Sequence, residues 1–202
     1  MGQDPSIEVL AQLDLVVVSP GVPLDLDFLV RLREMGKEVI SEIELAYREG
    51  LEKDIKFIAI TGTNGKTTTT SIVGEICKEA GLDTYVVGNI GNPAISAVEE
   101  AQPGAVLVTE LSSFQLEAVY DFRPEVSTVL NLTEDHMNRH HTMENYARAK
   151  ANIFAKQTPE MVCVLNYDDP ITREMGTSCP ARPVYFSRQA RPNGGIYLDG
   201  KE

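Results

Sequence analysis

The chain has 202 residues, and its 18 lysine and arginine side chains against 30 aspartate and glutamate side chains give a net charge of −12 and an isoelectric point of about 4.7. This acidic balance disfavours nonspecific binding to nucleic acid or to an anionic membrane surface. Three cysteines without C-x-x-C spacing predict neither a disulfide framework nor a zinc ribbon. No apolar run reaches the roughly 18 residues of a membrane span, so we expect a cytoplasmic protein.

The first fifty residues have the pattern of one end of a parallel α/β sheet. An apolar, β-branched run over 13–18 predicts a buried strand, and helical spacing of leucines predicts a helix over 25–35. A strand over 37–40 and a helix over 41–47, capped by Ser41, complete this region. The polar segment 50–54 then predicts a boundary between two domains, at residues 1–50 and 51–202.

The second region alternates strands and helices. Strands are predicted over 57–61, 84–87, 105–110, 126–131, 161–166 and 183–186, and helices over 66–80, 93–100 and 143–156. Such alternation is typical of an α/β fold with a parallel, helix-covered sheet, in which ligands bind at the carboxyl ends of the strands.

A glycine-rich loop separates the first of these strands from its helix. It reads Thr61-Gly-Thr-Asn-Gly-Lys-Thr67, which supplies backbone amides at a helix N-terminus, a lysine for phosphate oxygens and a hydroxyl for Mg²⁺. The position of the usual first P-loop glycine is Ile60, so the loop is shorter than that of common kinases and GTPases. A nucleotide triphosphate site is predicted, formed by Gly62, Thr63, Asn64, Gly65, Lys66, Thr67 and Thr68.

Glu110 ends a predicted strand of the same sheet. A carboxylate at that position suits a Mg²⁺ ligand, acting directly or through water. A solvated carboxylate is the alternative.

Three further residues have a structural and a functional interpretation. His136 follows the strand over 126–131, and with His140 it has helical spacing that imitates a zinc site, although the absence of a neighbouring thiolate disfavours zinc. Lys150 is either a solvated helix lysine or a functional one. Asn89, between two glycines, either forms a turn or approaches a ligand.

Five segments taken in order resemble the Mur ligases. They are the glycine loop over 61–67, Gly88-Asn-Ile-Gly91, Glu110-Leu-Ser-Ser-Phe-Gln-Leu-Glu117, Asn131-Leu-Thr-Glu-Asp-His-Met-Asn-Arg-His140 and Tyr146-Ala-Arg-Ala-Lys150. The resemblance implies an ATP-dependent amide ligase of bacterial peptidoglycan synthesis, acting in the cytoplasm as a monomer. The segments over 112–117 and 18–23 are similar to those of members that use UDP-N-acetylmuramoyl-L-alanine and D-glutamate.

The resemblance also implies roles for individual residues. ATP would phosphorylate the substrate carboxylate, and the amine of D-glutamate would attack the acyl phosphate. Lys66 would hold the β- and γ-phosphates, and Thr67 with Glu110 would hold one Mg²⁺. His136 would hold a second Mg²⁺, assisted by Lys150 as a carbamate. Lys66, His136 and Lys150 are thus the expected catalytic residues.

For the substrate, the resemblance implies contacts from Asn89 and Ser112. It also implies that residues 1–50 are the C-terminal part of a Rossmann-like N-terminal domain for the UDP substrate. Residues 51–202 would be a central ATP-binding domain, incomplete at its end, and the C-terminal amino-acid-binding domain would lie outside the chain. We therefore expect no ligation by this chain alone. Other Mur-type ligases, a P-loop phosphotransferase or a noncatalytic nucleotide-binding module are the alternatives.

Overall fold

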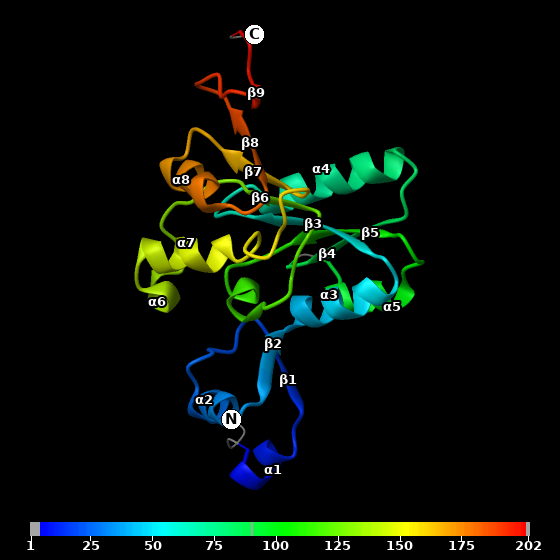
Figure 1. Ribbon diagram of the computed structural model, residues 1–202, viewed down its shortest axis with the longest axis vertical. Coiled ribbons are helices and arrows are strands. Elements are labelled where there is room, and N and C mark those ends of the chain that lie inside the picture. The colour runs from blue at the N-terminus through cyan, green and yellow to red at the C-terminus, as the bar shows by residue number, and fades with distance from the viewer. Residues whose placement is uncertain (1–4, 90, 201–202) are drawn as a thin grey trace.

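The computed structural model describes residues 5–89 and 91–200, and a parallel sheet of seven strands forms its centre (Figure 1). The spatial order of the strands is β4-β5-β3-β6-β7-β8-β9. The strands are β3 (Lys56–Thr61), β4 (Thr84–Gly88), β5 (Val106–Glu110), β6 (Val126–Val129), β7 (Val162–Asn166), β8 (Arg182–Ser187) and β9 (Ile196–Tyr197). Because β3 lies between β5 and β6, the chain changes direction across the sheet there, where ligands bind in open α/β folds.

Helices cover both faces of this sheet. The main hydrophobic cluster fills one face under α3 (Glu42–Glu52), α5 (Ala94–Glu100), α7 (Met143–Ala151) and α8 (Pro170–Ser178). The opposite face packs against α4 (Lys66–Glu79), whose Cys77 and Val73 contact Ile60 and Val108. The short helices η1 (Gln115–Ala118) and α6 (Met137–His140) lie in connecting segments. The predicted α/β fold with a parallel, helix-covered sheet is confirmed.

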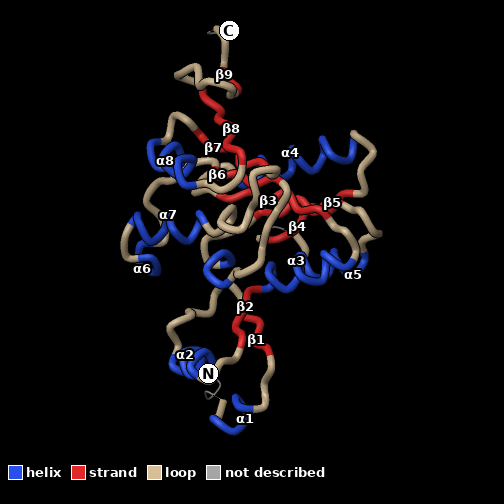
Figure 2. Tube along the Cα trace, viewed as in Figure 1, coloured by secondary structure: helices blue, strands red, loops and turns tan. Residues whose placement is uncertain are grey.

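Residues 5–41 form a smaller body, the N-terminal unit, which stands apart from the large sheet in Figure 2. It contains α1 (Ile7–Ala11), β1 (Leu15–Val18), α2 (Asp27–Glu34) and β2 (Glu38–Ser41), with β1 and β2 paired in parallel. The prediction that its first strand is buried is wrong for the residues described, because Leu15 is 37% and Val17 is 42% exposed. Only one face of this two-stranded ribbon is covered.

The helix α3 joins the N-terminal unit to the large sheet. Its Tyr47 forms an edge-to-face cluster with Phe57 and Phe122, with ring centroids 5.6–6.0 Å apart. Its buried Glu44 accepts hydrogen bonds from the backbone amides of residues 120, 121 and 122 at 2.9–3.0 Å. Since α3 runs to Glu52, a domain division at residue 50 would cut this helix, and the predicted division stays a prediction.

Several predicted ends of elements differ from the observed ones. The helix predicted over 143–156 ends at Ala151, and turns follow it. Ser41 is the N-cap residue of α3, as predicted, but its hydroxyl makes no capping hydrogen bond. Among the described residues this buried hydroxyl has no hydrogen-bond partner. The helices α6 and α8 were not predicted because their apolar spacing is short or interrupted.

Candidate functional site

The glycine loop lies at the carboxyl end of β3 and leads directly into α4. Gly65 has a φ of +82°, a left-handed conformation that a side chain would strain, and it is the N-cap of the helix. This conformation starts α4 with its first backbone amides free of intrahelical partners, which is the arrangement that binds anions at helix N-termini. Lys66 Nζ donates to the carbonyl of Thr63 at 2.8 Å, so its amine stays beside the loop.

A close backbone contact holds the end of β4 against the end of β5. Gly88 has a φ of +103°, and a Cβ at this position would lie 2.3 Å from the carbonyl oxygen of Glu110. Only glycine fits here, and its presence lets the amide of Asn89 donate to that same carbonyl at 2.8 Å. The predicted loop residue Asn89 is thereby brought to the predicted carboxylate Glu110.

Two polar side chains converge on the Glu110 carboxylate. Thr67 Oγ1 donates to Glu110 Oε2 at 2.8 Å, and Asn89 Nδ2 donates to Glu110 Oε1 at 2.9 Å. Glu110 is only 2% exposed, so the solvated interpretation of this residue is wrong. Within the described ranges no group of three or more histidine, cysteine or acidic side chains could hold a metal. The hydroxyl and carboxylate oxygens at this point suit Mg²⁺, which uses one or two protein oxygens and completes its shell with water or phosphate.

Lys150 is buried rather than solvated, with 2% of its surface exposed. Its Nζ donates to Thr61 Oγ1 at 3.1 Å and to the carbonyl of Gly62 at 2.9 Å, and it lies 4.9 Å from the centre of the Tyr146 ring. Burial, reinforced by the positive charge of Lys66, lowers the pKa of Lys150 to about 7. The solvated-helix interpretation is wrong, and a large fraction of this amine is neutral near pH 7.

Aromatic rings form one wall of the site. Phe114 lies 4.9 Å from the His136 ring and stacks on His140 at 5.5 Å. His136 is the exposed N-cap of α6, with a φ of +53°. His140 is buried at the end of α6, and its Nε2 lies 2.9 Å from Ser113 Oγ. His136 precedes the helix, so only His140 of the two lies within it. Burial also lowers the pKa of His140.

Part of this group of residues lines one pocket of about 250 Å³ at the carboxyl ends of the strands. Of the predicted site residues, Lys66, Asn89, Ser112, His136 and Lys150 line it. The remaining lining residues are Pro20, Ser113, Phe114, Asp135 and Tyr146. Sequence reasoning quoted Phe114 and Tyr146 within motifs but gave them no role, because an aromatic residue at helical spacing most often belongs to the core.

The predicted residues differ in whether they line this pocket. Ser112 donates to Gln115 Oε1 at 3.0 Å, which holds its hydroxyl at the pocket edge. Thr68 is exposed on α4 and is not among the residues that line the pocket, and the same holds for Gly62, Thr63, Asn64, Gly65, Thr67 and Glu110. The nucleotide contacts predicted for these residues stay predictions.

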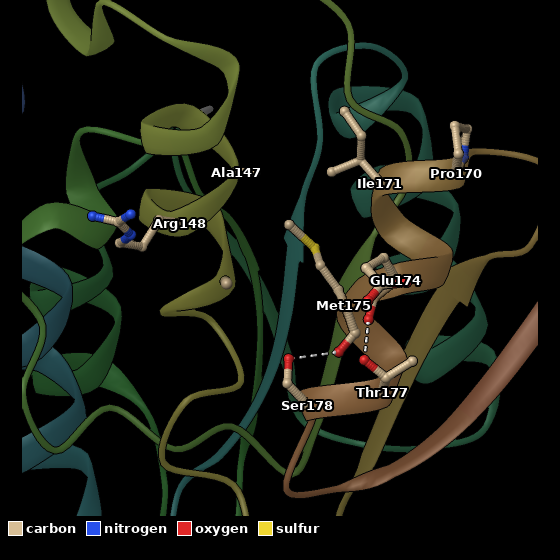
Figure 3. A pocket seen from close by; sticks show the side chains of 9 residues that line it. Ala147, Arg148, Pro170, Ile171, Glu174, Met175, Thr177 and Ser178 are labelled. Atoms are coloured by element: carbon tan, nitrogen blue, oxygen red, sulfur yellow. Dashed lines mark hydrogen bonds between the residues drawn. The ribbon is translucent and has the colours of Figure 1, made fainter.

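A larger hollow of about 650 Å³ lies elsewhere, between α7 and α8 (Figure 3). Its apolar lining comes from Ala147, Ala151, Pro170, Ile171 and Met175. Arg148 also borders the hollow, but its side chain points away from α8 in Figure 3. The hydroxyls of Thr177 and Ser178 are bonded to carbonyls of their own helix. The smaller pocket therefore holds the converging polar groups that chemistry requires.

Comparison with known proteins identifies the family. The family model of the Mur ligase middle domain matches residues 60–193. The chain belongs to the Mur ligase family. The part of the chain that this model matches includes the glycine loop, Glu110, His136 and Lys150.

Two curated relatives share more than half of their aligned residues with this chain. The chain is 58% identical over 195 residues to the UDP-N-acetylmuramoylalanine–D-glutamate ligase of Clostridioides difficile (strain 630), covering 96% of this chain and 43% of that enzyme. It is 56% identical to the same enzyme of Alkaliphilus oremlandii (strain OhILAs), covering 100% of this chain and 44% of the enzyme. The chain thus spans less than half the length of these curated relatives.

A solved structure supports the fold independently. The structure of UDP-N-acetylmuramoyl-L-alanyl-D-glutamate–2,6-diaminopimelate ligase superposes with a TM-score of 0.60 at 22% identity, over 88% of this chain and 46% of that one.

Across residues 5–89 and 91–200, no helix has both the length and the apolar character needed to cross a membrane.

Proposed function

We propose that this chain is the nucleotide-handling part of a Mur ligase that joins D-glutamate to UDP-N-acetylmuramoyl-L-alanine. The observation that carries the proposal is the convergence of Lys66, the Thr67–Glu110 pair and the buried Lys150 around one glycine loop. The identity of 58% to a D-glutamate ligase favours this substrate pair over those of other Mur ligases. The whole reaction would also need the segments that the longer relatives possess.

The residues fit ATP and Mg²⁺ by their own geometry. The loop offers backbone amides at the N-terminus of α4, and Lys66 offers a cation beside them. Thr67 and Glu110 would hold Mg²⁺, and His136 would contribute to a second ion. When bound, ATP supplies the phosphoryl group that activates the substrate carboxylate, with Mg²⁺ neutralising its charge.

The pocket walls would then orient the acceptor. Asn89 and Ser112 would contact the sugar-nucleotide substrate, while the ring of Phe114 would exclude water from the reacting carboxylate. Little covalent work falls to the protein in such a reaction, so positioning and charge stabilisation would account for most of the rate.

Lys150 would act as a carbamate. Its neutral amine would form a nitrogen–carbon bond with CO₂ and release one proton, which converts a buried cation into an anion. The low pKa of Lys150 supports this, because only the neutral amine can attack CO₂. Mass spectrometry in bicarbonate buffer should show about 44 Da of added mass that disappears on acidification and in Lys150→Gln. Equal masses for both proteins would contradict the carbamate.

Calorimetric titration of the chain with ATP tests the site itself. Lys66→Ala should weaken binding about a hundredfold, since it removes a charged hydrogen-bond donor to phosphate. Glu110→Gln keeps the shape of the side chain and should abolish the gain in affinity that Mg²⁺ gives the unmodified chain. Unchanged affinity in Lys66→Ala would overturn the phosphate-loop assignment.

A second assay addresses the complete reaction. In a protein that joins this chain to the remaining segments of its relatives, phosphate release should require both UDP-N-acetylmuramoyl-L-alanine and D-glutamate. ATP binding without any substrate-dependent phosphate release would instead favour a noncatalytic nucleotide-binding module.

A further inference from the structure

The segment 130–133, which follows β6, is hydrogen bonded along the glycine loop. The carbonyl of Asn131 accepts from the Thr63 amide at 2.9 Å, and Asn131 Oδ1 accepts from the Asn64 amide at 2.8 Å. Asn131 Nδ2 donates back to the Asn64 carbonyl at 2.9 Å, and the Thr133 amide donates to Thr63 Oγ1 at 3.1 Å. The position of residues 63 and 64 therefore depends on the position of this segment.

The other side of segment 130–133 is attached to the start of α8. Asp169 Oδ2 accepts from the amide of Leu132 at 2.6 Å. The second oxygen of the same carboxylate, Oδ1, accepts from the amides of Ile171 at 2.9 Å and Thr172 at 3.1 Å and so caps α8. One carboxylate thus joins a helix N-terminus to the backbone that supports the glycine loop.

Asn166, at the end of β7, provides a parallel attachment. Its Nδ2 donates to the carbonyl of Leu130 at 3.0 Å, and its Oδ1 accepts from the amide of Asp168 at 3.0 Å. The helix α8 is separated from α7 by the apolar hollow of Figure 3. Its N-terminal end is therefore placed by Asn166 and Asp169 and by its packing on β7, with little help from α7.

We propose that Asp169 is a positioning residue of the nucleotide site, which it controls through segment 130–133, with Asn166 as its partner. The inference rests on the proposed binding of ATP at the glycine loop. Neither residue lines the pocket, so both would act indirectly. They would fix residues 63 and 64, whose amides are bonded to Asn131, and so hold the amides that follow at the N-terminus of α4 in the orientation that an anion needs. A hydrogen bond to a carboxylate is among the stronger ones in proteins, and its loss would let the loop relax before it binds.

Substitutions can separate the two tasks of Asp169. Asp169→Ser keeps a hydroxyl that caps α8 but has no second oxygen for Leu132, whereas Asp169→Ala loses both. Asn166→Asp keeps the oxygen that accepts from Asp168 and removes the donor to Leu130. Val98→Ala is the stability control, because it removes buried methyl groups from α5 and leaves segment 130–133 untouched.

The measurements are the dissociation constant for MgATP by calorimetry and amide hydrogen exchange by NMR in the chain without nucleotide. We expect Asp169→Ser and Asn166→Asp each to weaken MgATP binding about tenfold. We also expect faster exchange at the amides of Thr63, Asn64 and Leu132 in Asp169→Ser. Val98→Ala should lower the melting temperature while leaving the dissociation constant and these amides unchanged.

The outcomes distinguish this inference from the proposed function. In one outcome, Lys66→Ala loses binding but Asp169→Ser and Asn166→Asp bind MgATP as tightly as the unmodified chain. That result would overturn the positioning role and leave the proposed nucleotide site intact. If the unmodified chain does not bind MgATP and Lys66→Ala behaves in the same way, both the positioning role and the proposed nucleotide site are overturned. An equal loss of affinity in Val98→Ala would show that stability alone is measured, and would also overturn the positioning role.

Discussion

The large sheet and the N-terminal unit are both built from parallel strands, yet they differ in what covers these strands. At the large sheet, polar groups such as Glu110 and Lys150 are at least 98% buried and have hydrogen-bond partners. In the N-terminal unit, apolar side chains lie exposed instead, among them Ile7, Val9, Val17 and Val30 at 39–53% exposure.

This difference shows where the chain can hold chemistry. A buried lysine or carboxylate needs a surrounding core that excludes water and supplies partners, and β3 obtains this from neighbours on both edges and helices on both faces. The ribbon of β1 and β2 has one small cluster, around Leu29 and Leu32. Exposed apolar faces of this kind are typical of surfaces that contact other protein.

Truncation of a core ring gives the largest expected contrast between the two regions. Phe57→Ala removes a fully buried ring that contacts Tyr47 and Phe122, and it should lower the free energy of unfolding by about 3–5 kcal/mol. Val17→Ala, at a half-exposed position of β1, should cost less than about 1 kcal/mol. Urea denaturation measures both. Similar losses in the two variants would show that the regions are equally well packed.

The buried amine of Lys150 should give the large sheet a pH dependence. Its pKa is about 7 in the folded chain against 10.5 ordinarily, so the unfolded chain binds this proton first as the pH falls below 10.5. Stability should therefore rise between pH 7 and pH 10 by about 4 kcal/mol more than in Lys150→Met. Urea denaturation across this range, in CO₂-free buffer, measures the difference.

The control for Lys150 is an exposed lysine just beyond the same helix. Lys156→Met should reproduce the pH profile of the unmodified chain. If stability depends on pH in the same way in Lys150→Met and in the unmodified chain, the pKa of Lys150 is the same in the folded and the unfolded chain, which would contradict this prediction.

The sequence predicted the loop better than its surroundings. A phosphate-binding loop is indicated by adjacent residues alone, namely glycines, a lysine and hydroxyls between a strand and a helix. Residues 62–67 could therefore be predicted as such a loop without knowledge of the fold. The burial of Lys150 could not be predicted from the sequence, because its neighbours Thr61 and Gly62 lie 88–89 positions earlier in the chain. The attachment of Asp169 to Leu132, 37 positions apart, was invisible for the same reason.

Errors in the predicted fold also have physical causes. The apolar run over 13–18 resembles a buried strand because hydrophobicity reports what a segment can bury, and the described residues cover only one side of it. His136 and His140 have helical spacing, but α6 begins only after His136, which has a left-handed backbone conformation. The two rings therefore both pack on Phe114, with His136 exposed and His140 buried.

Helix caps give the smallest and sharpest contrast between the regions. Thr142, beside the site, accepts a hydrogen bond from the Asn145 amide at 3.1 Å and caps α7, so Thr142→Ala should cost about 1 kcal/mol. Ser41, at the junction with the N-terminal unit, occupies the same position of α3, and its buried hydroxyl has no partner within residues 5–89 and 91–200. Ser41→Ala removes only that unsatisfied group and should leave stability unchanged or raise it slightly. Thermal denaturation of both variants decides the matter, since a loss in Ser41→Ala equal to that in Thr142→Ala would mean that the serine caps α3 in solution.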